Sequence, residues 1–270
     1  MKKTGEYTIG RFTKARELIT DAVDASKYYN HIIGLIEVDV TKGLTILTKH
    51  REKTGERLSF TSWIMKCVAQ AVSENLIIQT FRKGRKKTIT FHDVDIKCLV
   101  EKDMGEGRKV PIQYIIRKSN EKSYKEINDE IRTAQKYDED KNEVEQKTKN
   151  RQQMLMKFPT FIRRNFIWRN VMMDPFKIKR HIGTVGCTAV GMFGRGIAGW
   201  AIPKTMHSTT FALGAIVKKP VIIDDKIEHR DILHITAEFN HDIVDGAPAA
   251  RCMSRLTETI KEGFGLEDYM

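Results

Sequence analysis

His241 and Asp245, four residues apart, are the side chains in this 270-residue sequence best placed to do chemistry. Residues 231–239 alternate apolar and polar side chains, which predicts a strand, and the apolar spacing after Gly246 predicts a helix with one apolar face. A strand end holds an imidazole rigidly, while the adjoining loop leaves it accessible, and imidazole titrates near neutral pH. The arrangement therefore suits a general base.

The same junction also has a purely structural interpretation. Asp245 is a residue type that caps helix N-termini, and Pro248 is tolerated in the first turn of a helix. Histidines at strand ends commonly have no catalytic role. Spacing alone leaves both interpretations open.

The wider pattern resembles the active-site motif of the chloramphenicol acetyltransferase superfamily. His-x-x-x-Asp-Gly at 241–246, followed by Ala-x-Ala-Ala-Arg, is most similar to the catalytic domain of the dihydrolipoyl acyltransferases of 2-oxoacid dehydrogenase complexes. The stretch GTVGCTAVGMFGRG at 183–196 resembles that family's strand and glycine-rich turn, with Thr188 at the position of a catalytic hydroxyl that is usually a serine. The family usually has arginine after the histidine, whereas this chain has Asp242.

This resemblance implies an acyltransferase that moves an acyl group between a coenzyme A thioester and a dihydrolipoyl-like thiol or another small acceptor. His241 would be the general base, and the Thr188 hydroxyl would stabilise the oxyanion. Asp245 would tie the histidine loop to an arginine, for which Arg11 and Arg16 are the candidates. Acyl-CoA is thus expected as a substrate, with no permanently bound cofactor and no metal. The substrate-binding positions expected from the motifs are Gly183, Gly191 and Gly246.

Several elements must position these residues. The patterns predict a strand over 32–40, helices over 40–55 and 59–75, a strand around Pro111 and a charged helix over 123–149. The resemblance covers residues 30–120 moderately and 183–263 well. It implies an α/β fold, the chloramphenicol acetyltransferase-like two-layer sandwich, with a mixed β-sheet and flanking helices. It also implies a homotrimer or a higher multiple, in which one subunit's histidine meets its neighbour's hydroxyl.

We expect residues 1–270 to form a single acyltransferase catalytic domain with a basic and apolar insertion at about 147–181. No lipoyl or peripheral-subunit-binding domain is expected, so a lipoyl group would come from a separate carrier. The insertion interleaves bulky apolar residues with arginine between 151 and 181. One interpretation is structural: a helix packed on the trimer, with its arginines in water or against acidic neighbours. Two functional hypotheses are a wall of the acyl channel and an anionic membrane contact, and between these the position just before the Thr188 strand favours the channel.

The formal net charge is +12, and the segment 147–180 contributes +9 of it through ten basic residues and one acidic residue. No nucleic-acid-binding motif accompanies this excess, so we expect no nucleic-acid partner. A smaller basic cluster, RKGRKK at 82–87, is interpreted either as a solvated turn or as a contact for the phosphates of coenzyme A.

Four dispersed cysteines without a C-x-x-C pair favour free thiols in a reducing compartment. No apolar run approaches the ~20 residues of a membrane-spanning helix, and no secretory signal is evident, so we expect a cytoplasmic protein.

A second function class is a non-catalytic trimeric scaffold or binding module of the same fold. A scaffold needs neither His241 nor a hydroxyl at position 188, so their presence favours the enzyme.

Overall fold

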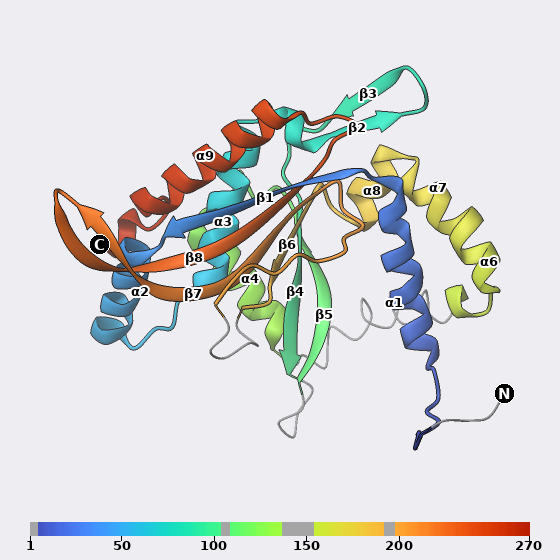
Figure 1. Cartoon of the computed structure of the whole chain (residues 1–270), viewed down its shortest axis with the longest axis horizontal. Helices are drawn as coiled ribbons and strands as arrows, with labels where there is room; N and C mark the ends of the chain where they lie inside the picture. The colour runs from blue at the N-terminus through green and yellow to red at the C-terminus, as the bar shows by residue number, and fades with distance from the viewer. Residues whose placement is uncertain (1–4, 104–108, 137–153, 192–197) are drawn as a thin grey trace.

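A six-stranded mixed sheet organises the computed structural model, which describes residues 5–103, 109–136, 154–191 and 198–270 (Figure 1). The strand order is β1-β8-β7-β6-β4-β5; β6 is parallel to both of its neighbours and the other pairs are antiparallel. The strands are β1 (His31–Asp39), β4 (Ile96–Asp103), β5 (Lys109–Ile116), β6 (Val185–Ala189), β7 (Thr209–Ile223) and β8 (Lys226–Asn240). A separate hairpin consists of β2 (Thr80–Lys83) and β3 (Lys87–Thr90).

Helices cover one face of the sheet: α2 (Thr41–Thr54), α3 (Phe60–Ser73), α4 (Tyr124–Gln135) and α9 (Gly246–Glu262). Gly55, with φ of 75°, ends α2, and the Ser59 side chain accepts a hydrogen bond from the Ser62 backbone at the start of α3. Both predicted helices are therefore confirmed. The predicted helix over 123–149 is α4 in its first part, and residues 137–149 lie outside the described residues.

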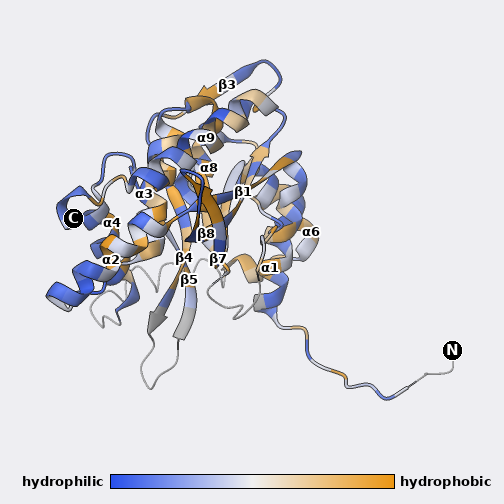
Figure 2. Cartoon of the chain, turned by 60° about the vertical axis from the view of Figure 1, so that its left-hand side comes forward, coloured by the Kyte–Doolittle hydropathy of each residue, from blue (hydrophilic) through white to orange (hydrophobic). Residues whose placement is uncertain are grey.

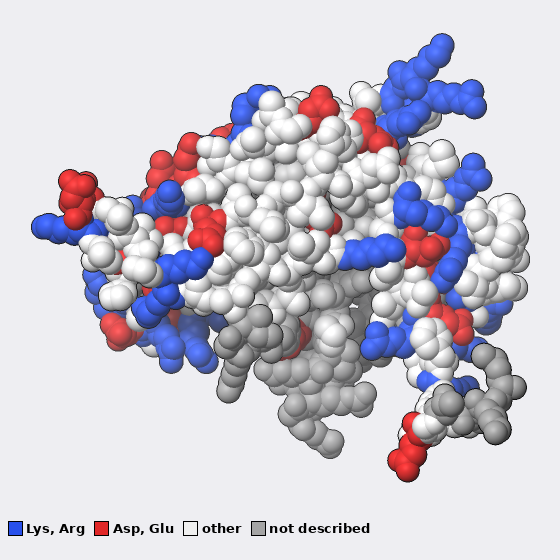
Figure 3. All heavy atoms as spheres, viewed as in Figure 1, with Lys and Arg blue, Asp and Glu red and all other residues white. Residues whose placement is uncertain are grey.

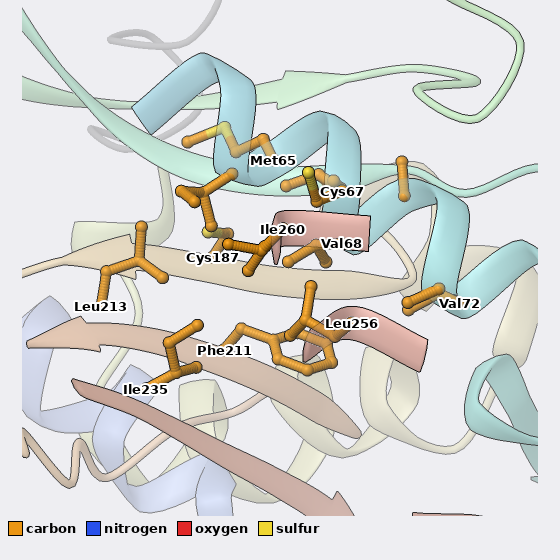
Figure 4. Packing of buried hydrophobic residues seen from close by; sticks show 14 of the residues in the cluster. Met65, Cys67, Val68, Val72, Cys187, Phe211, Leu213, Ile235, Leu256 and Ile260 are labelled. Carbon is orange, nitrogen blue, oxygen red and sulfur yellow. The ribbon is translucent and has the colours of Figure 1, made fainter. Parts of the chain in front are cut away.

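The main core lies between this helical layer and the sheet. Figure 4 shows Met65 and Val68 of α3 and Leu256 of α9 packed against Cys187 and Phe211 of the sheet. The inward-facing residues of β6, β7 and β8 are buried, which strand alternation requires for a half-covered sheet. The expected two-layer α/β sandwich is confirmed.

The opposite face of the sheet, called the open face below, carries the alternate residues of the same strands. One cross-strand row on it consists of Leu35, Thr236, Ala212 and Thr188, in the strand order β1, β8, β7, β6. Leu35 at the edge of this row is 48% exposed, whereas Thr236 and Ala212 are buried. The loop residue Trp200 packs on part of this face, with its ring edge-on to His234.

A second group of helices lies at the end of the molecule opposite α2 (Figure 1). It contains α1 (Lys14–Asp24), the short helix η1 (Ala25–Tyr28) and the elements of the insertion: α6 (Thr160–Ile162), the π-helix η4 (Arg163–Trp168), α7 (Arg169–Met172) and α8 (Pro175–His181). A small apolar cluster joins η1, α7, α8 and β2. Figure 2 shows apolar residues along the strands that the helices cover. Among the described residues, no helix is both long enough and apolar enough to cross a membrane.

Candidate active site

His241 lies immediately after the end of β8, as the alternation pattern predicts. Its backbone N–H donates to the Asn30 carbonyl at 2.7 Å, which holds the residue against the start of β1. The side chain is 48% exposed, and its Nδ1 lies 3.8 Å from Oδ1 of Asp245. The ring nitrogen that faces the carboxylate is thus Nδ1, and Nε2 is left for a reacting group.

Asp242 stands where the family motif usually has arginine, and hydrogen bonds hold it in the histidine loop. The Asn30 side-chain amide donates to the Asp242 carboxylate at 2.9 Å, and the Asp242 backbone N–H donates to the Asn240 side chain at 3.3 Å. Asn30 therefore holds the histidine loop through its carbonyl and through its side chain. Sequence reasoning missed Asn30, because its role depends on the pairing of β1 with β8 across more than two hundred residues.

Asp245 occupies the N-cap position of α9, but its side chain accepts no capping hydrogen bond. The carboxylate is 82% exposed, and within the described part of the chain its one ion pair is with His241. Arg11 and Arg16 are exposed and neither pairs with it in a single chain. The expected tie between Asp245 and an arginine is therefore not made within one copy.

Thr188 lies on β6 with its side chain on the open face, half-buried and opposite Ala212 of β7. No described residue forms a hydrogen bond with its hydroxyl, which leaves this donor available. Its cross-strand row reaches β8 at Thr236, five residues before His241. Five strand residues and two strand spacings separate the two side chains by roughly 19 Å. One chain does not bring His241 and Thr188 together.

The three predicted glycines have different surroundings. Gly183, with φ of +84°, lies in the turn between α8 and β6, where a Cβ would come within 2.8 Å of the Asp95 carbonyl oxygen. A Cβ on Gly191 would lie 1.9 Å from the Gly214 carbonyl oxygen, so this position requires glycine for close backbone packing. Gly246 begins α9 with open space around it. The remainder of the expected glycine-rich turn, 192–197, lies outside the described residues.

Two titratable side chains, Glu238 and His207, lie on the open face with pKa values shifted by burial. Glu238 lies two residues after Thr236 on β8, on the same face of the sheet. It is 2% exposed, and burial raises the pKa of its carboxyl to about 7. The His207 ring lies over Gly186 and shares a hydrogen bond with the Thr205 hydroxyl at 3.0 Å. Burial lowers the pKa of His207 to about 3, so this imidazole is neutral.

The four cysteines are buried free thiols. Burial raises the pKa of Cys98 and of Cys252 to about 12, and raises the pKa of Cys67 and Cys187 as well. A thiol that remains protonated is a poor nucleophile. None of the four cysteines is therefore a candidate nucleophile for this site.

The family model for the 2-oxoacid dehydrogenases acyltransferase catalytic domain matches residues 4–151 and 180–265, which together are most of the chain. The chain belongs to this family. An 84-residue stretch is 31% identical to the dihydrolipoyllysine-residue acetyltransferase component of the pyruvate dehydrogenase complex of Zymomonas mobilis. The match spans 31% of this acyltransferase-family chain and only 19% of that relative.

Solved acyltransferase structures share the fold across the whole chain. A probable dihydrolipoamide acetyltransferase of Listeria monocytogenes has a TM-score of 0.65 at 22% identity, covering 96% of this chain and 95% of its own. The dihydrolipoamide acetyltransferase of Azotobacter vinelandii has a TM-score of 0.68 at 16% identity, covering 96% of this chain and 93% of its own. The truncated catalytic core of the Thermoplasma acidophilum 2-oxoacid dehydrogenase complex has a TM-score of 0.62 at 17% identity, with 96% and 100% covered.

Residues 152–179, which the family model leaves unmatched, coincide with the insertion predicted from the sequence. Two of its arginines, Arg163 and Arg164, form internal ion pairs. Arg163, 4% exposed, donates to the Asp21 carboxylate at 2.6 Å, and Arg164 donates to the other oxygen of the same carboxylate at 2.7 Å. Arg163 also pairs with Glu17 at 3.2 Å. The insertion is thus bound to α1 by buried charges.

Proposed function

We propose that this chain transfers an acyl group between a coenzyme A thioester and a thiol of the dihydrolipoyl type or another small acceptor. His241 acts as the general base, and the Thr188 hydroxyl stabilises the oxyanion. The observation that carries the proposal is the half-exposed imidazole held at a strand end, with Nδ1 facing Asp245 and Nε2 accessible. Family membership indicates the class of reaction. The positions of the His241 and Thr188 side chains support the roles proposed for them.

The reaction needs only proton transfer and oxyanion stabilisation. His241 Nε2 takes the proton of the acceptor thiol, and the thiolate attacks the thioester carbonyl. The resulting oxyanion accepts a hydrogen bond from Thr188, which is typically worth about 2.7–4 kcal/mol of barrier. Collapse of the tetrahedral intermediate breaks the carbon–sulfur bond to coenzyme A, and the leaving thiolate takes the proton from His241. The Asp245 carboxylate faces Nδ1, so the accessible Nε2 is the ring nitrogen that exchanges the proton.

A site shared between two copies accounts for the roughly 19 Å between Thr188 and His241. Ile33 and Leu35 on the β1 edge of the open face are 49% and 48% exposed, and large exposed apolar groups beside a site favour coverage by a partner. Figure 3 shows mostly uncharged surface over β1. A solved structure with a TM-score of 0.67 at 16% identity is the cubic core of a pyruvate dehydrogenase multienzyme complex, which supports an assembly of several copies. We therefore propose a homotrimer or a multiple of it.

The Azotobacter vinelandii enzyme offers a parallel for the residue roles. Its structure concerns the part that a serine, a histidine and an asparagine play in its catalytic mechanism, and the asparagine follows the histidine by four residues. Asp245 has the same spacing from His241. Threonine replaces serine at position 188 and keeps the hydroxyl.

Variant mixing tests the chemistry and the shared site together. His241→Ala and Thr188→Val are each expected to lower kcat for acetyl-CoA-dependent transfer to dihydrolipoamide by at least 100-fold, while Thr188→Ser retains activity. Mixing the two inactive proteins under subunit exchange should restore part of the activity, because some interfaces then pair an intact histidine with an intact threonine. Full activity in Thr188→Val would contradict the oxyanion role, and no recovery on mixing would contradict the shared site.

The scaffold alternative makes the opposite prediction. A non-catalytic trimeric module would assemble normally but turn over neither acetyl-CoA nor acyl-dihydrolipoamide. We also propose that residues 1–270 act as one catalytic domain and that a lipoyl group, where it is the acceptor, comes from a separate carrier. Transfer to free dihydrolipoamide by the chain alone would support the first statement.

Membrane contact through 151–181 forms no part of the proposed function. Phe161 and Phe166 are 68% and 63% exposed, which suits an interfacial segment, but Arg163 and Arg164 are ion-paired with Asp21 and unavailable to anionic lipid. The insertion as a wall of the acyl channel stays a prediction. Flotation with anionic liposomes at low salt is expected to leave the protein at the bottom of the gradient.

A further inference from the structure

The β2–β3 hairpin concentrates positive charge. Five of the six residues at 82–87 are basic and exposed: Arg82, Lys83, Arg85, Lys86 and Lys87. No carboxylate in the described part of the chain forms an ion pair with any of them; the Arg82 side chain donates to the Gly84 carbonyl, and the Lys83 ammonium lies 4.6 Å from the centre of the Phe176 ring. Figure 3 shows Lys and Arg side chains projecting from the surface at the upper right, where Figure 1 places this hairpin.

This charge arrangement opposes the hairpin's own stability. Lys83 and Lys87 are direct cross-strand partners, and like charges opposite each other destabilise a strand pair. A two-stranded hairpin is marginal in any case. Uncompensated cations at such a position favour an anionic ligand that binds several of them at once.

The hairpin is connected to the strand end that carries His241. The Thr209 hydroxyl donates to the Ile78 carbonyl at 3.0 Å, two residues before β2 begins, and the Asn240 N–H donates to the Ser208 carbonyl at 2.8 Å. The base of the hairpin is thus held beside the end of β8. Figure 1 shows it at the same end of the molecule as the start of α9. Three residue steps from Thr80 to Lys83 carry the tip roughly 10 Å outward.

We propose that the hairpin binds the phosphate groups of the acyl-CoA, a proposal that rests on the proposed function. Coenzyme A carries a diphosphate and a 3′-phosphate, separated from its sulfur by a pantetheine arm about as long as four to five extended residues, roughly 15 Å. A thioester at His241 therefore places its phosphates within the range of the hairpin tip. Lysine and arginine bind phosphate through charge-assisted hydrogen bonds. Coenzyme A then enters the site on the side of the hairpin.

Substrate truncation separates phosphate recognition from chemistry. The test variant is Arg85→Gln, Lys86→Gln, Lys87→Gln in the full chain, since these three exposed side chains form no hydrogen bond or ion pair with a described residue. Its KM for acetyl-CoA is expected to rise roughly tenfold with kcat unchanged, whereas its KM for acetylpantetheine, which has no phosphates, stays the same. The matched control is Lys49→Gln, Arg51→Gln, Lys53→Gln on α2, three exposed cations at the opposite end of the molecule, and neither KM should change.

An acetyl-CoA KM that moves no more than in the α2 control would overturn the proposal. Calorimetric titration with coenzyme A provides a readout independent of turnover: weaker binding by the hairpin variant supports the site, and equal binding overturns it. If the parent turns over neither acetyl-CoA nor acetylpantetheine, the proposed function fails, and this titration alone still decides the hairpin. Loss of oligonucleotide or anionic-vesicle binding in the hairpin variant, with coenzyme A binding unchanged, would assign the cations to another polyanion.

Discussion

Glu238 combines nearly complete burial with a carboxyl whose pKa is raised to about 7 by that burial. Below pH 4.5 the group is protonated in both the folded and the unfolded chain. Between pH 4.5 and 7 the folded state retains the proton while the unfolded state loses it, so the free energy of unfolding falls as the pH rises, by up to about 3 kcal/mol. Glu238→Gln is therefore expected to stabilise the protein at pH 8 and flatten this dependence.

Chemical denaturation at pH 4.5, 6 and 8 measures the effect. Glu228→Gln is the control, because Glu228 lies on the same strand but is exposed. Equal pH profiles for the parent and Glu238→Gln would show that this carboxyl titrates normally.

The contact between Asn30 and Asp242 makes a second residue-scale prediction. Losing this hydrogen bond loosens the loop that carries His241, and small misplacements of a general base reduce turnover, here by roughly tenfold in kcat. Asn30→Ala and Asp242→Ala should each show this loss. The double variant should lose no more than either single variant, because both remove the same bond. Additive losses would mean that the two residues act independently.

At the scale of elements, the ion pairs of Asp21 hold the insertion to α1. The Asp21 carboxylate is 1% exposed and accepts from both Arg163 and Arg164. Asp21→Asn leaves the buried Arg163 without its full partner, which typically costs 3–5 kcal/mol. Hydrogen exchange should then accelerate in α1 and in residues 160–172, while β7 and β8 remain protected.

Asp24→Asn is the matched control on the same helix, since among the described residues its carboxylate forms an ion pair with the exposed Lys27 alone, at 2.9 Å. Its exchange pattern should equal that of the parent. Unchanged exchange in Asp21→Asn would mean that apolar packing alone holds the insertion in place.

At the scale of the whole molecule, the open face couples assembly to activity. Leu35 ends the cross-strand row that contains Thr188, and a charge there opposes burial against a second copy. Leu35→Glu is expected to shift the protein toward monomers in light scattering and to lower activity in parallel. Ile227→Glu, at the 74% exposed tip of the β7–β8 ribbon, is the control. An active Leu35→Glu monomer would refute a site between copies.

Local patterns in the sequence determined most of the elements. Alternation predicts β8, and helical spacing predicts α9, because each pattern depends on neighbours along the chain. The position of His241 at a strand end follows from the same local rules. The motifs at 183–196 and 241–246 were sufficient to indicate the family that the comparisons show.

Only the tertiary structure decided what depends on strand register and burial. Asn30 reaches Asp242 because β1 pairs with β8, and Glu238 acquires a raised pKa because the open face buries it. The arginines of the insertion appeared suited to a membrane in sequence, but the fold places a buried carboxylate from α1 between two of them. Charge in a sequence carries no information about its counter-charge when the partner lies about 140 residues away, since only folding brings the two together.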